Sequence, residues 1–218
     1  MAVAGLTLEL RPTAAGQVGL FPEHAAMLPW LRDRVAERAA ERAAFSDRPA
    51  VLNLFAYTGL ASLAAVGAGA SVVHIDAARP TVTWARRNAE LTGLSDAPIR
   101  WIVDDARAFT AREVRRGRRY DGIVLDPPSY GHGPGSAAWQ IDRDLPLLLE
   151  ACARLLAPGG FALLTAHSDG YGPGRLEGGL AIALGRAARA VESGPLELVT
   201  ADGRRLEIGA FARSAGGA

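Results

Sequence analysis

Five consecutive residues combine groups that could hold and orient a reacting amine: Asp126, Pro127, Pro128, Ser129 and Tyr130. The two prolines cannot continue a helix or donate ladder hydrogen bonds, so they predict a rigid loop. The Asp126 carboxylate and the Pro127 carbonyl both accept hydrogen bonds, and together they could turn the lone pair of an amine toward an electrophile. Tyr130 could stack on a planar acceptor, which is worth roughly 1–3 kcal/mol for a base. We therefore expect Asp126, Pro127, Pro128 and Tyr130 to form a reaction centre that orients an acceptor without a strong base.

A second chemistry-bearing segment ends one apolar run and opens a helical pattern, and its residues are Asn53, Phe55, Tyr57, Thr58 and Gly59. Backbone N–H groups at the start of a helix can bind an anion. Dinucleotide sites place three spaced glycines here because a pyrophosphate approaches the backbone closely, whereas this segment offers only Gly59. A smaller anion fits better, such as the methionine carboxylate of S-adenosylmethionine. An ordinary strand-to-helix turn is the alternative interpretation.

Acidic residues stand at the ends of three successive predicted strands, and they sharpen the choice of cofactor. Asp76 ends the second strand, where a carboxylate can accept both hydroxyls of a ribose. Asp105 follows the third strand and would lie near an adenine amino group, and Asp126 follows the fourth. Each aspartate could instead cap the helix that follows it. Three on one rim favour a cofactor site for S-adenosylmethionine, and that site would also include Ala77 and Ala106.

The elements that must position these residues follow a regular alternation from residue 50 onward. Apolar runs typical of strands cover residues 50–55, 71–75, 99–103, 120–125 and 161–165. Helical patterns cover residues 59–68, 80–91, an arginine-rich stretch to about 116, and 144–156. This alternation predicts an α/β fold with a doubly wound, mostly parallel sheet. Two further runs, 196–200 and 205–211, flank Ala201-Asp202-Gly203 and predict an antiparallel hairpin at the end of the sheet.

Residues 1–48 follow a different pattern, and we expect them to form an N-terminal extension of a domain spanning 49–218. The extension contains a strand-like run at 6–10 and an amphipathic helix within 23–45. Residues 16–23 connect the two. Near the other end of the chain, the glycine-rich stretch 170–179 reads as a flexible loop that could act as a lid.

Composition limits the classes of protein that remain. A chain of 218 residues with 49% hydrophobic residues can bury a core of domain size. The chain has no long apolar run and its first residues lack the pattern of a signal peptide, so we expect no membrane partner. The single cysteine, Cys152, excludes an internal disulfide and suits a reducing compartment, which predicts a cytoplasmic protein. The net charge of +1 supplies no field that would gather nucleic acid. The oligomeric state stays open.

Several polar residues outside these segments carry weaker signals. The arginines between 112 and 119 lead into the start of a strand, which puts most of them at the rim opposite the cofactor. His167 follows the fifth strand on the correct rim and could contact substrate. Glu23 and His24 open the long helix, where an acidic residue complements the helix dipole. His132 and Trp139 lie just beyond the predicted reaction centre. No grouping of His, Cys and Asp has the spacing of metal ligands, so we expect no metal.

These motifs resemble a known family. The segment 53–59, the acidic residues Asp76 and Asp105, and the 126–130 segment are similar to the methyltransferase domain of bacterial large-subunit (23S) ribosomal RNA methyltransferases and their relatives. The resemblance covers about residues 16–170. It implies a Rossmann-like class I methyltransferase fold with a seven-stranded sheet ending in an antiparallel hairpin. It also implies that Phe55, Asp76, Asp105 and Asp126 line the site of S-adenosylmethionine, with RNA as the acceptor.

The chain departs from that family in two ways, and these departures limit which substrates and acceptor atoms we expect. Better-known members carry an N-terminal RNA-binding PUA domain, for which this chain has no room. Members that methylate C5 of cytosine need a cysteine nucleophile after the fifth strand, where this chain reads Thr165-Ala166-His167-Ser168. Cys152 lies in an apolar helical run, which favours a packing role. We therefore expect transfer to a nitrogen or oxygen.

Three alternatives remain at this point. The acceptor could be a small molecule or a protein, because neither charge nor an accessory domain supports RNA. A non-catalytic nucleotide-binding module of the same fold is disfavoured by the intact Asp126-Pro127-Pro128 loop. An NAD-dependent oxidoreductase is disfavoured by the missing glycines.

Overall fold

The computed structural model describes residues 1–13, 16–43, 47–131, 138–200 and 202–216. His132, Ala201 and the last residues of the predicted 23–45 helix lie outside these ranges. Among the described residues, no helix combines the length and the apolar character needed to cross a membrane.

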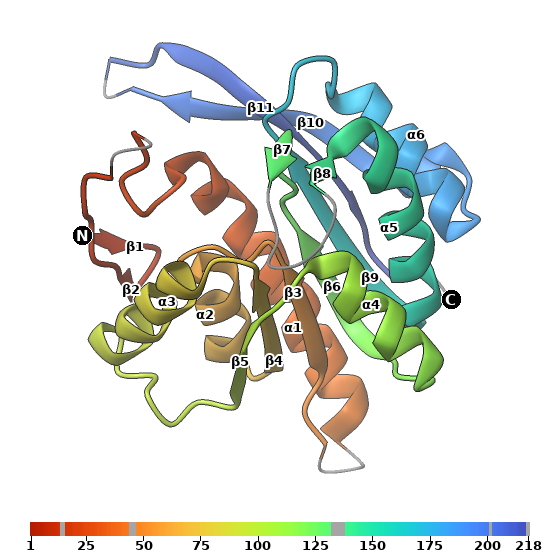
Figure 1. Ribbon diagram of the computed structural model, residues 1–218, viewed down its shortest axis with the longest axis horizontal. Coiled ribbons are helices and arrows are strands. Elements are labelled where there is room, and N and C mark those ends of the chain that lie inside the picture. The colour runs from red at the N-terminus through yellow and green to blue at the C-terminus, as the bar shows by residue number, and fades with distance from the viewer. Residues whose placement is uncertain (14–15, 44–46, 132–137, 201, 217–218) are drawn as a thin grey trace.

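A seven-stranded sheet forms the centre of the molecule, in the order β10-β11-β9-β6-β3-β4-β5. Its strands are β3 (Ala50–Leu54), β4 (Ser71–Asp76), β5 (Ile99–Val103), β6 (Tyr120–Leu125), β9 (Leu156–Ala166), β10 (Glu192–Val199) and β11 (Arg205–Ser214). The first five are parallel to one another, and β11 is antiparallel to both β9 and β10. The predicted fold, a seven-stranded mostly parallel sheet that ends in an antiparallel hairpin, is confirmed. Figure 1 shows this hairpin extending past the body of the sheet at the upper left.

Helices cover both faces of the sheet (Figure 1). One face packs against α4 (Ala106–Arg115), α5 (Ile141–Leu155) and α6 (Pro173–Leu184), and the other against α1 (Leu28–Arg42), α2 (Leu60–Gly67) and α3 (Arg79–Leu91). Successive strand residues point to opposite faces, so Leu52 and Leu54 join the first layer while Val51 joins the second. Because crossovers connect parallel strands, the carboxyl ends of β3, β4, β5, β6 and β9 meet at one rim.

The N-terminal residues pack onto the second layer. They form β1 (Ala2–Val3), β2 (Leu6–Thr7) and a 3-10 helix, η1 (Pro22–Met27), before α1 begins. The predicted strand at 6–10 is thus shorter than expected, although Leu6 and Leu8 are buried. The amphipathic helix is present, with Leu31 and Val35 fully buried along its inner face. At the rim opposite the reaction loop, Arg38 and Arg42 of α1 reach the buried Asp121, each at 2.8 Å.

The prediction of a flexible loop at residues 170–179 is wrong, because most of these residues belong to α6. Glycine disfavours helix, but burial of Leu176, Leu180 and Ala181 against α5 and the sheet outweighs that preference. Strand β9 also begins earlier than predicted, at Leu156 rather than Phe161. The remaining short elements are β7 (Tyr130–Gly131), β8 (Trp139–Gln140) and η3 (Ala188–Ala190).

Candidate cofactor and reaction site

A cavity of about 480 Å³ lies at the carboxyl ends of the parallel strands, within the usual volume range of small-molecule sites. Its lining comes from loops after β3, β4, β5, β6 and β9, together with the N-terminal segment and β8. The predicted site residues that line it are Phe55, Tyr57, Asp76, Ala77, Asp105, Ala106, Asp126, Pro127 and Pro128. Gln17, Phe21, Trp139 and His167 join them. The structure therefore brings together most of the residues predicted from separate segments.

The loop after β3 adopts an unusual backbone. Phe55 and Tyr57 have φ angles of 54° and 49°, in the left-handed region that non-glycine residues rarely occupy. Gly59, at φ 93°, is the N-cap of α2, and a Cβ there would lie 3.2 Å from the Cβ of Ala85. Left-handed residues persist only where the surroundings hold them, and they gather at binding sites. This loop is therefore shaped by its contacts and needs glycine at position 59.

Asp76 is one of those contacts. Its two carboxylate oxygens accept the backbone N–H groups of Tyr57 and Ala78, each at 2.9 Å. Each oxygen keeps a second lone pair that could accept a hydroxyl from a ligand in the cavity. Burial raises the pKa of Asp76, although the two N–H donors oppose that rise. The carboxylate thus organises the loop and still presents acceptors to the cavity.

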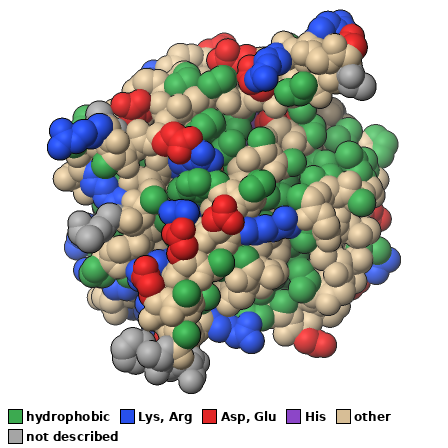
Figure 2. Space-filling view, turned by 180° about the vertical axis from the view of Figure 1, so that it is seen from behind, with side chains coloured by type: hydrophobic (Ala, Val, Ile, Leu, Met, Phe, Trp, Pro, Cys, Tyr) green, Lys and Arg blue, Asp and Glu red, His purple; other side chains and the backbone are tan. Residues whose placement is uncertain are grey.

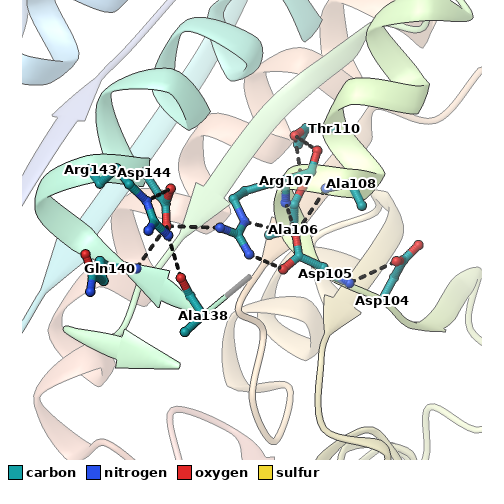
Figure 3. A network of polar contacts seen from close by, with 10 residues as sticks. All are labelled: Asp104, Asp105, Ala106, Arg107, Ala108, Thr110, Ala138, Gln140, Arg143 and Asp144. Atoms are coloured by element: carbon teal, nitrogen blue, oxygen red, sulfur yellow. Dashed lines mark hydrogen bonds and ion pairs between the residues drawn. The ribbon is translucent and has the colours of Figure 1, made fainter. Parts of the chain in front are cut away.

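Asp105 lies at the N-terminus of α4 and has more partners than the sequence suggested (Figure 3). Its carboxylate accepts the N–H groups of Arg107 and Ala108 and pairs with the Arg107 guanidinium at 2.9 Å. Arg107 also reaches Asp144 on α5 at 3.0 Å. The helix-cap interpretation of Asp105 is therefore correct, and the same residue also lines the cavity beside Ala106.

The reaction loop is held from three sides. Thr165 Oγ1 donates to Asp126 Oδ1 at 2.7 Å, and the indole N–H of Trp139 donates to the Pro128 carbonyl at 2.6 Å. Ser129 Oγ contacts Ser168 Oγ at 2.7 Å. Within the described part of the chain, no group donates to the Pro127 carbonyl, which leaves this oxygen for a ligand. The acceptor pair inferred from the sequence, Asp126 and the Pro127 carbonyl, borders the cavity.

Tyr130 does not join this cavity. Its side chain is 75% exposed, and it borders a separate hollow of about 250 Å³ with Ser129 and Ser168. The aromatic residues beside the reaction loop are instead Trp139 and Phe55, whose ring centroids lie 4.9 Å apart.

Three predicted cofactor residues, Asn53, Thr58 and Gly59, face a smaller neighbouring cavity of about 50 Å³. Asn53 Nδ2 donates to Ser62 Oγ at 2.9 Å, and Ser62 Oγ lies 3.0 Å from Nδ1 of the buried His74. Burial lowers the pKa of His74 to about 3, so this imidazole is neutral at physiological pH. Thr58 Oγ1 donates to the Gly19 carbonyl at 2.8 Å and ties the loop to the N-terminal segment.

The structure adds a cluster that sequence spacing could not reveal. Glu23 and His24 of η1 meet His167 beside Asp126, although 144 positions separate Glu23 from His167. The sequence placed His167 on the cofactor rim and Glu23 and His24 at the start of the long helix, but nothing in their spacing brought the two parts together. Cys152, by contrast, is buried in α5, and burial raises the pKa of its thiol to about 12, which removes it as a nucleophile at neutral pH.

Comparisons with known proteins agree with this geometry. Residues 5–191 match the family model of the S-adenosylmethionine-dependent methyltransferases. A ribosomal RNA large subunit methyltransferase K/L of Magnetococcus marinus is 34% identical over 163 residues, which cover 73% of this chain and 21% of that protein. A ribosomal RNA large subunit methyltransferase K of Neisseria meningitidis is 34% identical over 144 residues, covering 65% and 38% respectively. The chain thus spans well under half the length of these curated relatives.

Solved structures give the same result. The SAM-dependent methyltransferase of Agrobacterium tumefaciens superposes with a TM-score of 0.88 and 38% identity, over 100% of this chain and 69% of that one. SMU.776, solved in complex with SAH, superposes with a TM-score of 0.70 over 91% of this chain and 51% of that one. Its 19% identity supports the shared fold alone.

Proposed function

This chain belongs to the family of S-adenosylmethionine-dependent methyltransferases, and we propose that its acceptor is a nitrogen or oxygen atom of an RNA base. The enzyme class and the cofactor follow from the family. The acceptor, the atom methylated and the role of each site residue are proposals. The observation that carries them is the placement of Asp126 and the free Pro127 carbonyl at one cavity with Asp76 and Asp105.

The residues around the cavity fit this cofactor. We assign the ribose hydroxyls to Asp76, whose two oxygens each keep a lone pair after binding Tyr57 and Ala78. The adenine would lie beside Ala77, Asp105 and Ala106, and the methionine end near Phe55 and the start of α2. We keep Asn53, Thr58 and Gly59 as proposed cofactor residues, acting through the shape of the loop rather than from the larger cavity.

S-adenosylmethionine supplies an electrophilic methyl group on a positively charged sulfur. The protein's part is to hold the acceptor in line with that group and to exclude water. Asp126 Oδ2 and the Pro127 carbonyl would accept two N–H bonds of an amine and leave its lone pair directed at the methyl carbon. Trp139 fixes the loop through Pro128, because its N–H occupies the Pro128 carbonyl and the ring is buried. Asp126 is thus an orienting acceptor.

RNA as acceptor is supported by the relatives, which are named as ribosomal RNA large subunit methyltransferases. The exposed Tyr130 next to the reaction loop offers a ring on which a base could stack. Charge gives little support, because the net charge of the chain is only +1. On the one face that Figure 2 presents, acidic and basic side chains are interspersed. We infer that recognition depends on stacking and shape more than on a basic surface.

Transfer to C5 of cytosine does not fit. That reaction needs a thiolate to add to the ring, and the single cysteine of the chain is Cys152, buried in α5. A nitrogen or oxygen acceptor needs no such nucleophile. We further propose that residues 1–48 are an extension that completes the cofactor cavity through Gln17 and Phe21, and that the protein acts in the cytoplasm.

Radiolabelled methyl transfer tests the acceptor. Total RNA, protein and metabolite fractions from cells lacking the gene are incubated with the enzyme and labelled S-adenosylmethionine. We expect label in ribosomal RNA that ribonuclease releases and protease leaves in place. The Asp126→Asn variant should bind the cofactor but label RNA at least about tenfold more slowly. Label confined to proteins or metabolites would overturn the RNA proposal and leave the family assignment intact.

A further inference from the structure

Three side chains with metal-binding atoms meet beside the reaction loop: Glu23, His24 and His167. One nitrogen of each imidazole and one oxygen of the carboxylate lie within 4.8 Å of one another. Glu23 and His24 come from η1, and His167 follows β9. The fold therefore assembles two imidazoles and a carboxylate from two distant parts of the chain.

The carboxylate of this cluster is buried, and the two imidazoles are partly exposed. The Glu23 side chain is 3% exposed, and its Oε1 lies 3.0 Å from His167 Nε2. His24 Nε2 is buried and has no hydrogen-bond partner among the described residues. An imidazole nitrogen that is buried without a partner costs free energy. A ligand that accepts its lone pair would remove that cost.

The surroundings favour a cation. Asp126 Oδ2 lies 3.8 Å from His24 Nε2, so two carboxylates, those of Glu23 and Asp126, face the imidazoles. Phe21 packs against both rings, with centroid separations of 5.6 Å to His24 and 5.3 Å to His167. Its apolar ring limits the access of water and holds the two imidazoles in place. A divalent cation at this position would balance the two negative charges.

We propose that Glu23, His24 and His167 bind a divalent transition metal of the zinc class. Zinc binds imidazole nitrogen and carboxylate oxygen at about 2.0–2.2 Å in tetrahedral geometry, so neighbouring ligand atoms lie about 3.3 Å apart. The separation of 3.0 Å between Glu23 Oε1 and His167 Nε2 is close to that value. Magnesium and calcium prefer all-oxygen sites, which this pair of imidazoles disfavours.

Three protein ligands leave a fourth position, which is the arrangement of catalytic rather than structural zinc sites. Asp126, the proposed acceptor-orienting residue, lies next to this cluster, with its Oδ2 3.8 Å from His24 Nε2. A metal here would therefore stand beside the acceptor and could polarise the oxygen or nitrogen that receives the methyl group. The proposal concerns metal binding itself and does not depend on which acceptor the enzyme uses.

Cobalt titration of the full chain tests the site. The protein is stripped with a chelator, then titrated with Co²⁺, whose visible absorption reports tetrahedral coordination, and metal content is measured after gel filtration with Zn²⁺. We expect about one metal per chain, displacement of Co²⁺ by Zn²⁺, and a Kd raised at least about 100-fold in His24→Ala and in Glu23→Gln. Asp169→Asn, which removes an exposed carboxylate two residues beyond His167, should bind metal like the wild type.

Folding is checked for each variant by circular dichroism and by S-adenosylhomocysteine binding. Glu23→Gln keeps the size of the side chain and a hydrogen-bond partner for His167, so it separates metal binding from packing. Uptake of less than about 0.2 metal per chain by the folded wild-type protein would overturn the proposal. Equal metal affinity in His24→Ala and the wild type would also overturn it.

Discussion

Replacing Asp76 with alanine tests the proposed cofactor site most directly. The carboxylate accepts the backbone N–H groups of Tyr57 and Ala78, each at 2.9 Å, and we assign its remaining lone pairs to the two ribose hydroxyls. Hydrogen bonds to a charged group contribute about 1.5–3 kcal/mol each. The lower value is appropriate because the site opens to solvent. Loss of two such bonds should therefore weaken binding by about 3 kcal/mol, which is roughly a 150-fold rise in Kd.

The substitution also leaves the N–H groups of Tyr57 and Ala78 without their acceptor. Both lie near solvent, so water can replace the carboxylate and the free energy of unfolding should fall by only about 1–2 kcal/mol. Tyr57 holds a left-handed backbone conformation, and the loop will lose part of its shape when that contact is removed. The free energy of binding should thus fall by more than the free energy of unfolding.

Isothermal titration calorimetry with S-adenosylmethionine and S-adenosylhomocysteine measures the affinity, and urea unfolding measures the stability. Asp169→Ala serves as a control, because this exposed carboxylate lies outside the cavity lining. Wild type and control should bind both ligands and show no measurable affinity for NADH. If folded Asp76→Ala binds S-adenosylmethionine within threefold of the wild type, Asp76 does not hold the ribose and the assignment is refuted.

Three further predictions concern the acceptor, the pH dependence and the N-terminal segment. Tyr130→Ala should lower kcat/KM for RNA by about 5- to 150-fold, since base stacking contributes about 1–3 kcal/mol. The Kd for S-adenosylmethionine should stay the same. An unaltered kcat/KM would exclude stacking of a base on Tyr130. The pKa of His74 is held near 3 in the fold against 6.5 as the ordinary value, so the unfolded chain takes up the proton first as the pH falls below 6.5. Stability should then drop by up to about 1.4 kcal/mol per pH unit. The free energy of unfolding, measured with urea at pH 7.5 and at pH 5, should fall less between these pH values in His74→Gln than in the wild type. Equal falls in the two proteins would contradict a neutral, buried His74 as the cause. Gly19→Ala would place a Cβ 2.1 Å from the Trp84 ring at a φ of 93°, so its free energy of unfolding should fall by at least about 2 kcal/mol; an unchanged melting temperature would show that the segment adjusts freely.

The strands and the rim they form could be predicted because buried parallel strands leave a strong signal. The runs at 99–103 and 120–125 match β5 and β6 residue for residue. Once the strands are known, topology alone brings Asp76, Asp105 and Asp126 to one edge. The partners of each aspartate could not be predicted in the same way. Asp105 both caps α4 and pairs with the guanidinium of Arg107, and the sequence pattern indicates only the cap.

Features that depend on tertiary packing could not be predicted. Helix α6 contains Gly174, Gly178 and Gly179, and its stability comes from the buried Leu176 and Leu180 rather than from helix propensity. The direction of the Tyr130 side chain follows from the short pairing of β7 with β8, and no hydrophobic periodicity in the sequence predicts that pairing. The cluster of Glu23 with His167 needs the whole sheet before the two residues meet.

The position of β11 has a consequence for synthesis of the protein. This strand lies between β9 and β10 in the sheet, yet it follows both of them in the sequence and so leaves the ribosome after them. Until residues 205–214 emerge, β9 has no partner on its outer side, and β10 has no place in the sheet. An open strand edge of this kind can pair with other chains. The nascent protein therefore depends on residues 205–214 to join β10 to β9, and premature termination near residue 200 should yield aggregates rather than a shortened enzyme.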